Sequence, residues 1–186
     1  MVILASASPR RQELLKLVVQ DFSICPADID ETIPEDIAAE NAAEYLAVKK
    51  ASAVADDPQH MYDTVIGCDT VVVLDGEIMG KPRDINQARE MLTKLSGRVH
   101  KVITGVCICS RGKRTSFSET TEVEFYPLSP KGIEDYISTG DPMDKTGAYG
   151  IQSQGCMLVK GIIGDFFNVV GLPVARLRRE LDKIVL

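Results

Sequence analysis

Hydrophobic and polar positions follow two different periods along the chain, and each period predicts a different kind of element. Short apolar runs rich in Val and Ile, bounded by turn residues, predict strands, whereas apolar residues spaced three and four apart predict helices. The predicted strands cover residues 2–5, 22–25, 65–74, 77–79, 99–109, 115–126 and 157–163. Helices are predicted from Ser8, from residue 37 to about 55, from Asp84 to about residue 95, from Ser129, and from Leu172 to the C-terminus.

Turn and capping residues mark the ends of these elements. Ser8 followed by a proline is a favoured helix start, and Asp84 with Gln87 three residues later has the pattern of a capping box. An Asp-Gly pair at residues 75–76 predicts a hairpin, and residues 140–150 predict a loop. Because helices and strands interleave throughout, we expect an α/β fold in which one domain over residues 1–186 has a mixed sheet flanked by helices.

Composition and charge narrow the possible functions. The chain has 21 Lys+Arg against 27 Asp+Glu, and a net charge of −6 argues against a general nucleic-acid binder. Its two histidines, His60 and His100, lie far apart without metal motifs around them, which excludes His-rich zinc sites. The chain shows no signal-peptide core, no apolar run of about 18 residues and no CxxC pair. We therefore expect a cytoplasmic protein with reduced thiols and no membrane or nucleic-acid partner.

The first candidate site is the start of the first helix. The phosphate-binding motifs GxxxxGK[ST] and strand-linked GxGxxG are absent from the sequence, so phosphate binding needs another arrangement. Arg10 and Arg11 fall in the first helical turn, where the helix dipole disfavours each cation by about 0.3–1 kcal/mol. A bound anion would reverse that sign, because backbone N–H groups and two guanidiniums would converge on it. The alternative is a pair of solvated arginines.

The second candidate site is a set of acidic residues. Asp69 and Thr70 interrupt two apolar runs, and Gly67 before them allows close approach of another group. Asp30 and Glu31 lie in an acidic loop that could reach the same place. Carboxylates and hydroxyls without histidine are ligands typical of Mg²⁺. The alternative is an Asp-Thr turn that only caps local backbone.

The third candidate set consists of lysines. Lys81 precedes Pro82 and is therefore held in extended geometry at the start of a loop. Lys50 falls in the second half of the helix predicted over residues 37–55, and Lys145 follows Asp144 in the loop at 140–150. Taken singly, each lysine also fits a solvated surface position.

These candidates lie within a series of unusual motifs that occur in a fixed order. The motifs are Ser6-Ala-Ser-Pro-Arg-Arg11, Gly67-Cys-Asp-Thr70, Lys81-Pro-Arg-Asp84, Leu95-Ser-Gly97 with His100, Asp144-Lys-Thr-Gly-Ala-Tyr-Gly-Ile-Gln152 and Val169-Val-Gly-Leu-Pro173. In this respect the chain resembles the Maf proteins, a family of nucleoside triphosphate pyrophosphatases also described as septum-formation inhibitors. The resemblance covers essentially the whole chain.

The resemblance implies a fold, a reaction and partners. The fold would be similar to that of the inosine triphosphate pyrophosphatases (Maf/Ham1), with a substrate cleft and a homodimeric state. The reaction would be hydrolysis between the α and β phosphates, giving a nucleoside monophosphate and pyrophosphate with Mg²⁺, or with Mn²⁺ or Co²⁺. The biological role would be house-cleaning of nucleotides, with a possible link to cell division arrest.

The resemblance also implies a role for each candidate residue. Asp69 matches the proton acceptor that activates the attacking water, and a metal ion would acidify that water. Glu31 is the expected second carboxylate at the metal beside Asp69, with Asp30 less favoured. The triphosphate would be bound by a set of basic and hydroxyl side chains, namely Ser8, Arg10, Arg11, Lys50, Lys81 and Lys145, acting mostly through electrostatic stabilisation.

Substrate choice is expected to follow three residues. Arg11, Thr70 and Gln152 match the family branch that acts on dTTP and UTP, although Thr146 and Ser153 depart from that branch's usual residues. The Gln152 amide can donate to O4 and accept from N3–H of uracil or thymine, whereas cytosine presents the reversed pattern. Two alternatives stay open: a 7-methyl-GTP pyrophosphatase, and a non-enzymatic regulator of septum formation that senses nucleotide.

Overall fold

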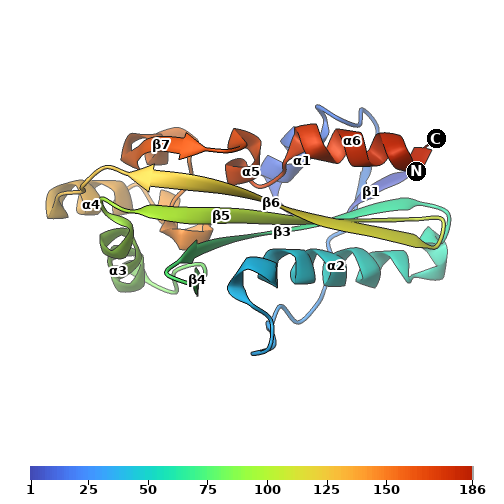
Figure 1. The fold of residues 1–186 in the computed structure, drawn as a ribbon, viewed down its shortest axis with the longest axis horizontal. Helices are drawn as coiled ribbons and strands as arrows, with labels where there is room; N and C mark the ends of the chain where they lie inside the picture. Colours follow the sequence, from blue (N-terminus) through green and yellow to red (C-terminus); the bar gives the residue numbers. More distant parts are fainter. Residues whose placement is uncertain (186) are drawn as a thin grey trace. The chain divides into compact units, whose positions relative to one another are not determined.

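The computed structural model describes residues 1–185, which form a mixed seven-stranded sheet with helices (Figure 1). The strand order is β2 (Ser23–Ile24), β1 (Val2–Leu4), β3 (Thr64–Leu74), β5 (Val99–Ser110), β6 (Lys113–Phe125) and β7 (Val159–Ile163), and β4 (Glu77–Met79) also pairs with β3. β1 runs parallel to β2 and β3, whereas β3–β4 and β6–β7 are antiparallel. The predicted mixed α/β sheet is confirmed.

Helices connect most of the strands. The α-helices are α1 (Pro9–Leu15), α2 (Ala42–Ala55), α3 (Ile85–Leu95), α4 (Pro130–Ile137), α5 (Phe166–Val170) and α6 (Val174–Val185). Shorter 3-10 turns are η1 (Ala39–Asn41), η2 (Pro58–His60), η3 (Asp141–Asp144), η4 (Thr146–Ala148) and η5 (Ser153–Leu158). No helix within residues 1–185 is long and apolar enough to span a membrane.

Capping residues place three helix starts where the sequence predicted them. The side-chain oxygens of Ser8, Asp84 and Ser129 accept hydrogen bonds from backbone N–H groups in the first turns of α1, α3 and α4. The predicted capping box at α3 is wrong in its second half. Gln87 Oε1 accepts from the backbone N–H of Arg83 at 2.7 Å, instead of from the backbone of Asp84.

Other boundaries differ from the prediction for local reasons. The last strand begins at Val159, two residues later than predicted, because residues 153–158 form η5. The loop at 140–150 contains two 3-10 turns, with left-handed backbone at Gly140 and Gly147. Helix α5 was not predicted, because five residues are too few to show a helical period.

The chain divides into two compact units. Unit 1 comprises Met1–Thr70, Thr104–Glu119 and the C-terminal segment from Gly171, and unit 2 comprises Val71–Ile103 and Thr120–Val170. Strands β3, β5 and β6 each contribute residues to both units, so neither unit is one continuous segment of chain. The single domain expected over residues 1–186 stays a prediction.

In unit 1, helix α2 packs closely against the sheet because two strand residues have no side chain. A Cβ at Gly67 would lie 2.4 Å from the carbonyl oxygen of Ala47, and one at Gly105 would lie 2.3 Å from the main chain of Ala43. Figure 1 shows α2 on one face of the strands and α6 on the other. This close packing fixes the position of Lys50, which lies in the second half of α2.

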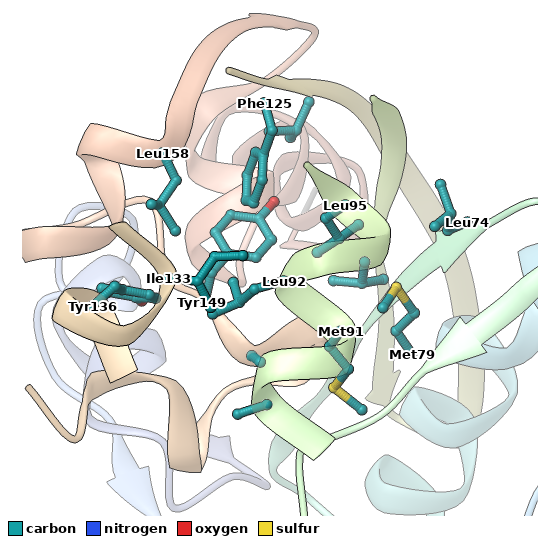
Figure 2. Close-up of a cluster of buried hydrophobic side chains, with 14 of the residues drawn as sticks. Leu74, Met79, Met91, Leu92, Leu95, Phe125, Ile133, Tyr136, Tyr149 and Leu158 are labelled. Atoms are coloured by element: carbon teal, nitrogen blue, oxygen red, sulfur yellow. The ribbon is translucent and has the colours of Figure 1, made fainter. Parts of the chain in front are cut away.

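In unit 2, an apolar core forms around α3 and α4. Figure 2 shows the rings of Tyr149 and Phe125 next to each other, with Leu92 and Leu95 of α3 beside them. His100 joins these two rings in edge-to-face contacts with centroids 4.7–5.3 Å apart. The Nε2 atom of His100 also lies 2.7 Å from the Tyr149 hydroxyl, which ties the loop carrying Tyr149 to β5.

Candidate active site

Asp69 is an ionisable residue within the long buried strand β3. It is 8% exposed, and the strand residues from Val65 to Cys68 before it are buried. A buried carboxylate is costly unless it is paired, so Asp69 requires a partner of opposite charge. Because alternate residues of a strand share a face, Asp69 projects on the same side as Gly67, toward α2. The close approach of α2 at Gly67 therefore brings Lys50 to the carboxylate.

Lys50 joins Asp69 to the acidic loop. Its Nζ atom lies 2.6 Å from Asp69 Oδ1 and 2.9 Å from Glu31 Oε1. The side chains of Lys50 and Asp69 are 11% and 12% exposed, whereas Glu31 is 60% exposed and lies at the solvent edge. Glu31 and Asp69 thus share the ammonium group of Lys50, and the expectation that Glu31 is the second carboxylate at a metal stays a prediction. The ammonium group between them was not foreseen, because Lys50 was assigned only to phosphate.

Asp30, the less favoured candidate, has a local role in the same loop. Its Oδ1 accepts hydrogen bonds from the hydroxyl of Thr32 at 2.6 Å and from the Thr32 backbone N–H at 2.9 Å. These bonds hold the pKa of the Asp30 carboxyl below its usual range. Asp30 thus closes a turn, and Glu31 is the carboxylate of this loop that pairs with Lys50, as Asp69 does.

The available donors fit one class of metal site. Asp69 and Glu31 offer carboxylate oxygens, the ligands that Mg²⁺ prefers. Within residues 1–185 no group of three or more His, Cys, Asp or Glu side chains is arranged to hold a metal ion. A divalent ion here would take two protein carboxylates and complete its shell from water and phosphate oxygens. That arrangement is common for Mg²⁺ at phosphoryl-transfer sites and unlike a structural zinc site.

Arg11 is held by three different elements of unit 1. Its Nη2 donates to Thr70 Oγ1 at 2.9 Å, its Nη1 to Ser6 Oγ at 3.3 Å, and its Nε to the carbonyl oxygen of Gly171 at 3.0 Å. Gly171 has a φ of +127°, a conformation that favours glycine, and a Cβ there would lie 3.6 Å from Arg11 Nε. Gly171, in the motif at residues 169–173, therefore provides an acceptor that holds the Arg11 guanidinium in place. These bonds use three of its five N–H groups.

Sequence reasoning missed a residue behind Thr70. Thr104 on β5 is fully buried, and its Oγ1 lies 3.0 Å from Thr70 Oγ1. The hydroxyl of Thr70 is thus fixed from both sides, by Arg11 and by Thr104. The available signal was a hydroxyl residue inside the apolar run at 99–109, which resembles an ordinary strand threonine.

The other two residues at the start of α1 have a less specific geometry. Ser8 Oγ accepts from the backbone N–H of Arg11 at 3.5 Å and so caps the helix. Arg10 is half-buried in the first turn. Their roles at a phosphate stay predictions.

Burial around Asp69 also affects its neighbour in the strand. Cys68 is fully buried, and this burial raises the pKa of its thiol to about 11, against the opposing influence of Arg11. The thiol is therefore a packing group at neutral pH and does not act as a nucleophile.

Unit 2 contains the remaining three predicted residues. Lys81 is exposed and follows Gly80, whose carbonyl oxygen accepts from the backbone N–H of Gly147 at 3.0 Å. This bond joins the segment of Lys81 to the loop that carries Lys145. Gln152 is exposed and directly precedes η5.

Lys145 is engaged by carboxylates of its own loop. Its Nζ donates to the carbonyl oxygen and Oδ1 of Asp141 and to Oδ1 of Asp144, each at 2.8 Å. Arg11, Thr70 and Asp69 belong to unit 1, and Lys145 belongs to unit 2. The expectation that all the candidates line one substrate cleft stays a prediction.

The fold places the protein in a known structural class. The Ham1 protein of Staphylococcus aureus matches it with a TM-score of 0.54, at 20% sequence identity and over 98% of both chains. At that identity the match shows the fold alone. The predicted likeness to the Maf/Ham1 fold is confirmed.

Sequence comparison then gives the family. The family model described as Maf-like protein matches residues 1–184, and the chain belongs to this family. Relatives from Geobacillus sp. and Bacillus velezensis are each 50% identical over 183 residues, covering 98% of this chain and 97% and 95% of theirs. A relative from Halalkalibacterium halodurans is 46% identical over 180 residues, covering 97% of this chain and 94% of its own. All three are named dTTP/UTP pyrophosphatase.

Proposed function

We propose that the protein is a nucleoside triphosphate pyrophosphatase that hydrolyses dTTP and UTP to the nucleoside monophosphate and pyrophosphate. The observation that carries this proposal is 50% identity, over nearly the full length, to relatives named dTTP/UTP pyrophosphatase. The meeting of Asp69, Glu31 and Lys50 at one point supports it, because this constellation suits phosphate chemistry.

Asp69 is the proposed proton acceptor for the water that attacks the α phosphorus. Its carboxylate is held on β3 and oriented by the ammonium of Lys50 at 2.6 Å. Glu31 completes the acidic pair at the solvent edge. A divalent cation held by Asp69 and Glu31, Mg²⁺ first and Mn²⁺ or Co²⁺ as alternatives, would acidify the water and neutralise phosphate charge when bound.

The basic residues are proposed to bind the triphosphate. The Lys50 ammonium has three N–H groups, of which Asp69 and Glu31 engage two, so one N–H can reach a phosphate oxygen. Arg11 keeps two N–H groups beyond its three bonds within unit 1. Further phosphate contacts are proposed for the residues whose side chains carry suitable donors, namely Ser8, Arg10, Lys81 and Lys145.

Base recognition is assigned to Gln152, with Arg11 and Thr70 as the other specificity residues. An exposed amide at residue 152 can donate to O4 and accept from N3–H of uracil or thymine. Arg11 and Thr70 are fixed to each other at 2.9 Å, so they act as one rigid unit. A homodimeric state and a cytoplasmic location complete the proposal, and light scattering of the purified protein tests the former.

The test is pyrophosphate release from a panel of UTP, dTTP, CTP, GTP and 7-methyl-GTP with Mg²⁺. We expect UTP and dTTP to be preferred, and Asp69→Asn to lower the rate about 10²–10⁴-fold while keeping the fold. Glu35→Gln is the control for loss of an acidic side chain, because Glu35 is an exposed acid of the loop that carries Glu31, and within residues 1–185 Lys50 pairs with Glu31 and Asp69 instead. Preference for 7-methyl-GTP would favour the other family branch. Nucleotide binding without turnover would favour a nucleotide-sensing regulator.

A further inference from the structure

The carboxylate of Asp141 is the centre of a hydrogen-bond network in unit 2 that neither the sequence motifs nor the proposed mechanism includes. Its Oδ1 accepts from Lys145 Nζ at 2.8 Å and from Ser153 Oγ at 3.4 Å. Its Oδ2 accepts from the hydroxyl of Tyr136 at 2.7 Å. Both oxygens are therefore in use, and they join the two ends of the loop that runs from Lys145 to Ser153.

Tyr136 extends this network to the backbone of the same loop. Its hydroxyl donates to Asp141 and accepts from the backbone N–H of Gly150 at 3.3 Å. The ring comes from α4 and lies in the buried core, 5% exposed (Figure 2). A Cβ at Gly155 would lie 1.9 Å from the carbonyl oxygen of Gly150 and 2.9 Å from the Tyr136 hydroxyl. The backbone on either side of Gln152 is thus folded tightly onto this phenol.

The charge states of the pair fix the direction of its hydrogen bond. Burial opposes ionisation of Asp141, but hydrogen bonds from Lys145 and Tyr136 outweigh it and hold the pKa of the carboxyl below its usual range. Burial and the adjacent Asp141 raise the pKa of Tyr136. The phenol therefore stays a donor and the carboxylate an acceptor at neutral pH.

The loop needs such an anchor because its backbone is strained. Ala148 and Ser153 are not glycines, yet they have φ values of +61° and +53°. Left-handed backbone at residues other than glycine costs free energy and persists only where surrounding contacts hold it. Ser153, which follows Gln152 directly, is held in part by its bond to Asp141.

We propose that Asp141 and Tyr136 are positioning residues for nucleotide recognition, which fix Lys145 and the backbone flanking Gln152 and so set where the Gln152 amide meets the base. This inference rests on the proposed function. Neither residue contacts the substrate in it. Asp141 acts through Lys145 and Ser153, and Tyr136 acts through Gly150.

The test measures base discrimination, which a merely structural role would leave unchanged. In Tyr136→Phe and Asp141→Asn we expect the ratio of kcat/KM for UTP to that for CTP to fall about tenfold, the equivalent of one net hydrogen bond. The loss of discrimination should appear mainly as a higher KM for UTP. The kcat for UTP should stay within about threefold of the wild-type value, because Asp69 is unchanged. Asp141→Glu, which keeps the carboxylate, should restore most of the ratio.

Asp135→Asn is the matched control, because Asp135 lies next to Tyr136 on α4 but is exposed and paired with Lys131. It changes the net charge as Asp141→Asn does and should keep the wild-type ratio. Urea unfolding of each variant identifies any variant that fails to fold. The base-discrimination ratios of the remaining Asp141 and Tyr136 variants then decide the proposal. A wild-type ratio in folded Tyr136→Phe and Asp141→Asn, or a fall confined to kcat, would overturn the proposal.

The outcome for the proposed function is separate. If the wild-type protein shows no turnover, the proposed pyrophosphatase activity is wrong. The positioning role is then tested by equilibrium binding of UTP and CTP to the same variants. A tenfold loss of binding preference then supports the role of Asp141, and an unchanged preference rejects it.

Discussion

His100 is a buried histidine that should make the stability of the protein depend on pH. It is 2% exposed, and its Nδ1 atom has no hydrogen-bond partner within the described residues. Burial lowers the pKa of His100 from 6.5 to about 4. The imidazole is therefore neutral in the folded protein across a pH range in which the unfolded chain binds a proton.

The sign and size of the effect follow from this difference. Because His100 binds more protons in the unfolded chain than in the folded protein below pH 6.5, its contribution to the free energy of unfolding is fully present above pH 6.5 and falls until about pH 4. A difference of about 2.5 pKa units corresponds to about 3.4 kcal/mol in total, and about 2.5 kcal/mol of it falls between pH 7.5 and 4.5. That is a large part of a typical stability of about 5–15 kcal/mol.

The assay is urea unfolding of the wild type and of His100→Gln at several pH values from 7.5 to 4.5. The variant should be less stable at pH 7.5, yet its stability should fall by about 2.5 kcal/mol less than that of the wild type on acidification. Taking the difference between the two proteins removes the contribution of carboxylates that titrate in both. Tyr149→Phe is the control: it removes the hydroxyl beside Nε2 but leaves the imidazole buried, so the wild-type slope should remain. If the difference in free energy of unfolding between the wild type and His100→Gln does not change with pH, the reasoning is wrong.

Three further predictions test the packing, the buried hydroxyl and a helix cap. Gly105→Ala should destabilise the protein by about 3 kcal/mol or more in urea unfolding and slow pyrophosphate release, because its Cβ would lie 2.3 Å from the main chain of α2, which carries Lys50. Thr104→Val should lower the free energy of unfolding by about 1 kcal/mol and weaken UTP binding in calorimetry, because Thr70 loses a hydrogen bond. Thr104→Ser, which keeps the hydroxyl, should behave as wild type. Ser129→Ala should lower the free energy of unfolding by about 1 kcal/mol, and Ser129→Asp should restore it, because Ser129 caps α4.

Features encoded by neighbouring residues could be predicted from the sequence. The caps at Ser8, Asp84 and Ser129 depend on one side chain and the next turn of the chain, and all three are confirmed. The out-of-pattern Asp69 in an apolar run indicated an unusual site, and in the structure Asp69 and Glu31 both pair with Lys50, while their catalytic and metal-binding roles stay predictions.

Features that depend on distant segments could not be predicted in this way. The carbonyl oxygen of Gly171 holds Arg11 across 160 residues, and Thr104 supports Thr70 across 34. The motif at residues 169–173 was visible in the sequence, but nothing in it indicated that its glycine carbonyl would accept from Arg11, and Thr104 looked like an ordinary strand threonine. The role of Tyr136, in the helix predicted from Ser129, was not predicted either. Only the folded loop brings the backbone N–H of Gly150 to its hydroxyl.

Lys50 of unit 1 and Lys145 of unit 2 differ in a way that residue type alone does not reveal. Lys50 donates to two carboxylates and can contact a phosphate oxygen with its third N–H while keeping both partners. Lys145 donates to three oxygens, two of them from Asp141 and one from Asp144, so the phosphate contact proposed for it would have to displace one of them. Breaking the bond to Asp144 should cost the least free energy, because that carboxylate is 69% exposed and can be solvated by water. Asp141 is only 19% exposed and also accepts from Tyr136. In the proposed function, a phosphate that took the place of Asp144 would therefore leave the Asp141 network, and with it the backbone on either side of Gln152, unchanged.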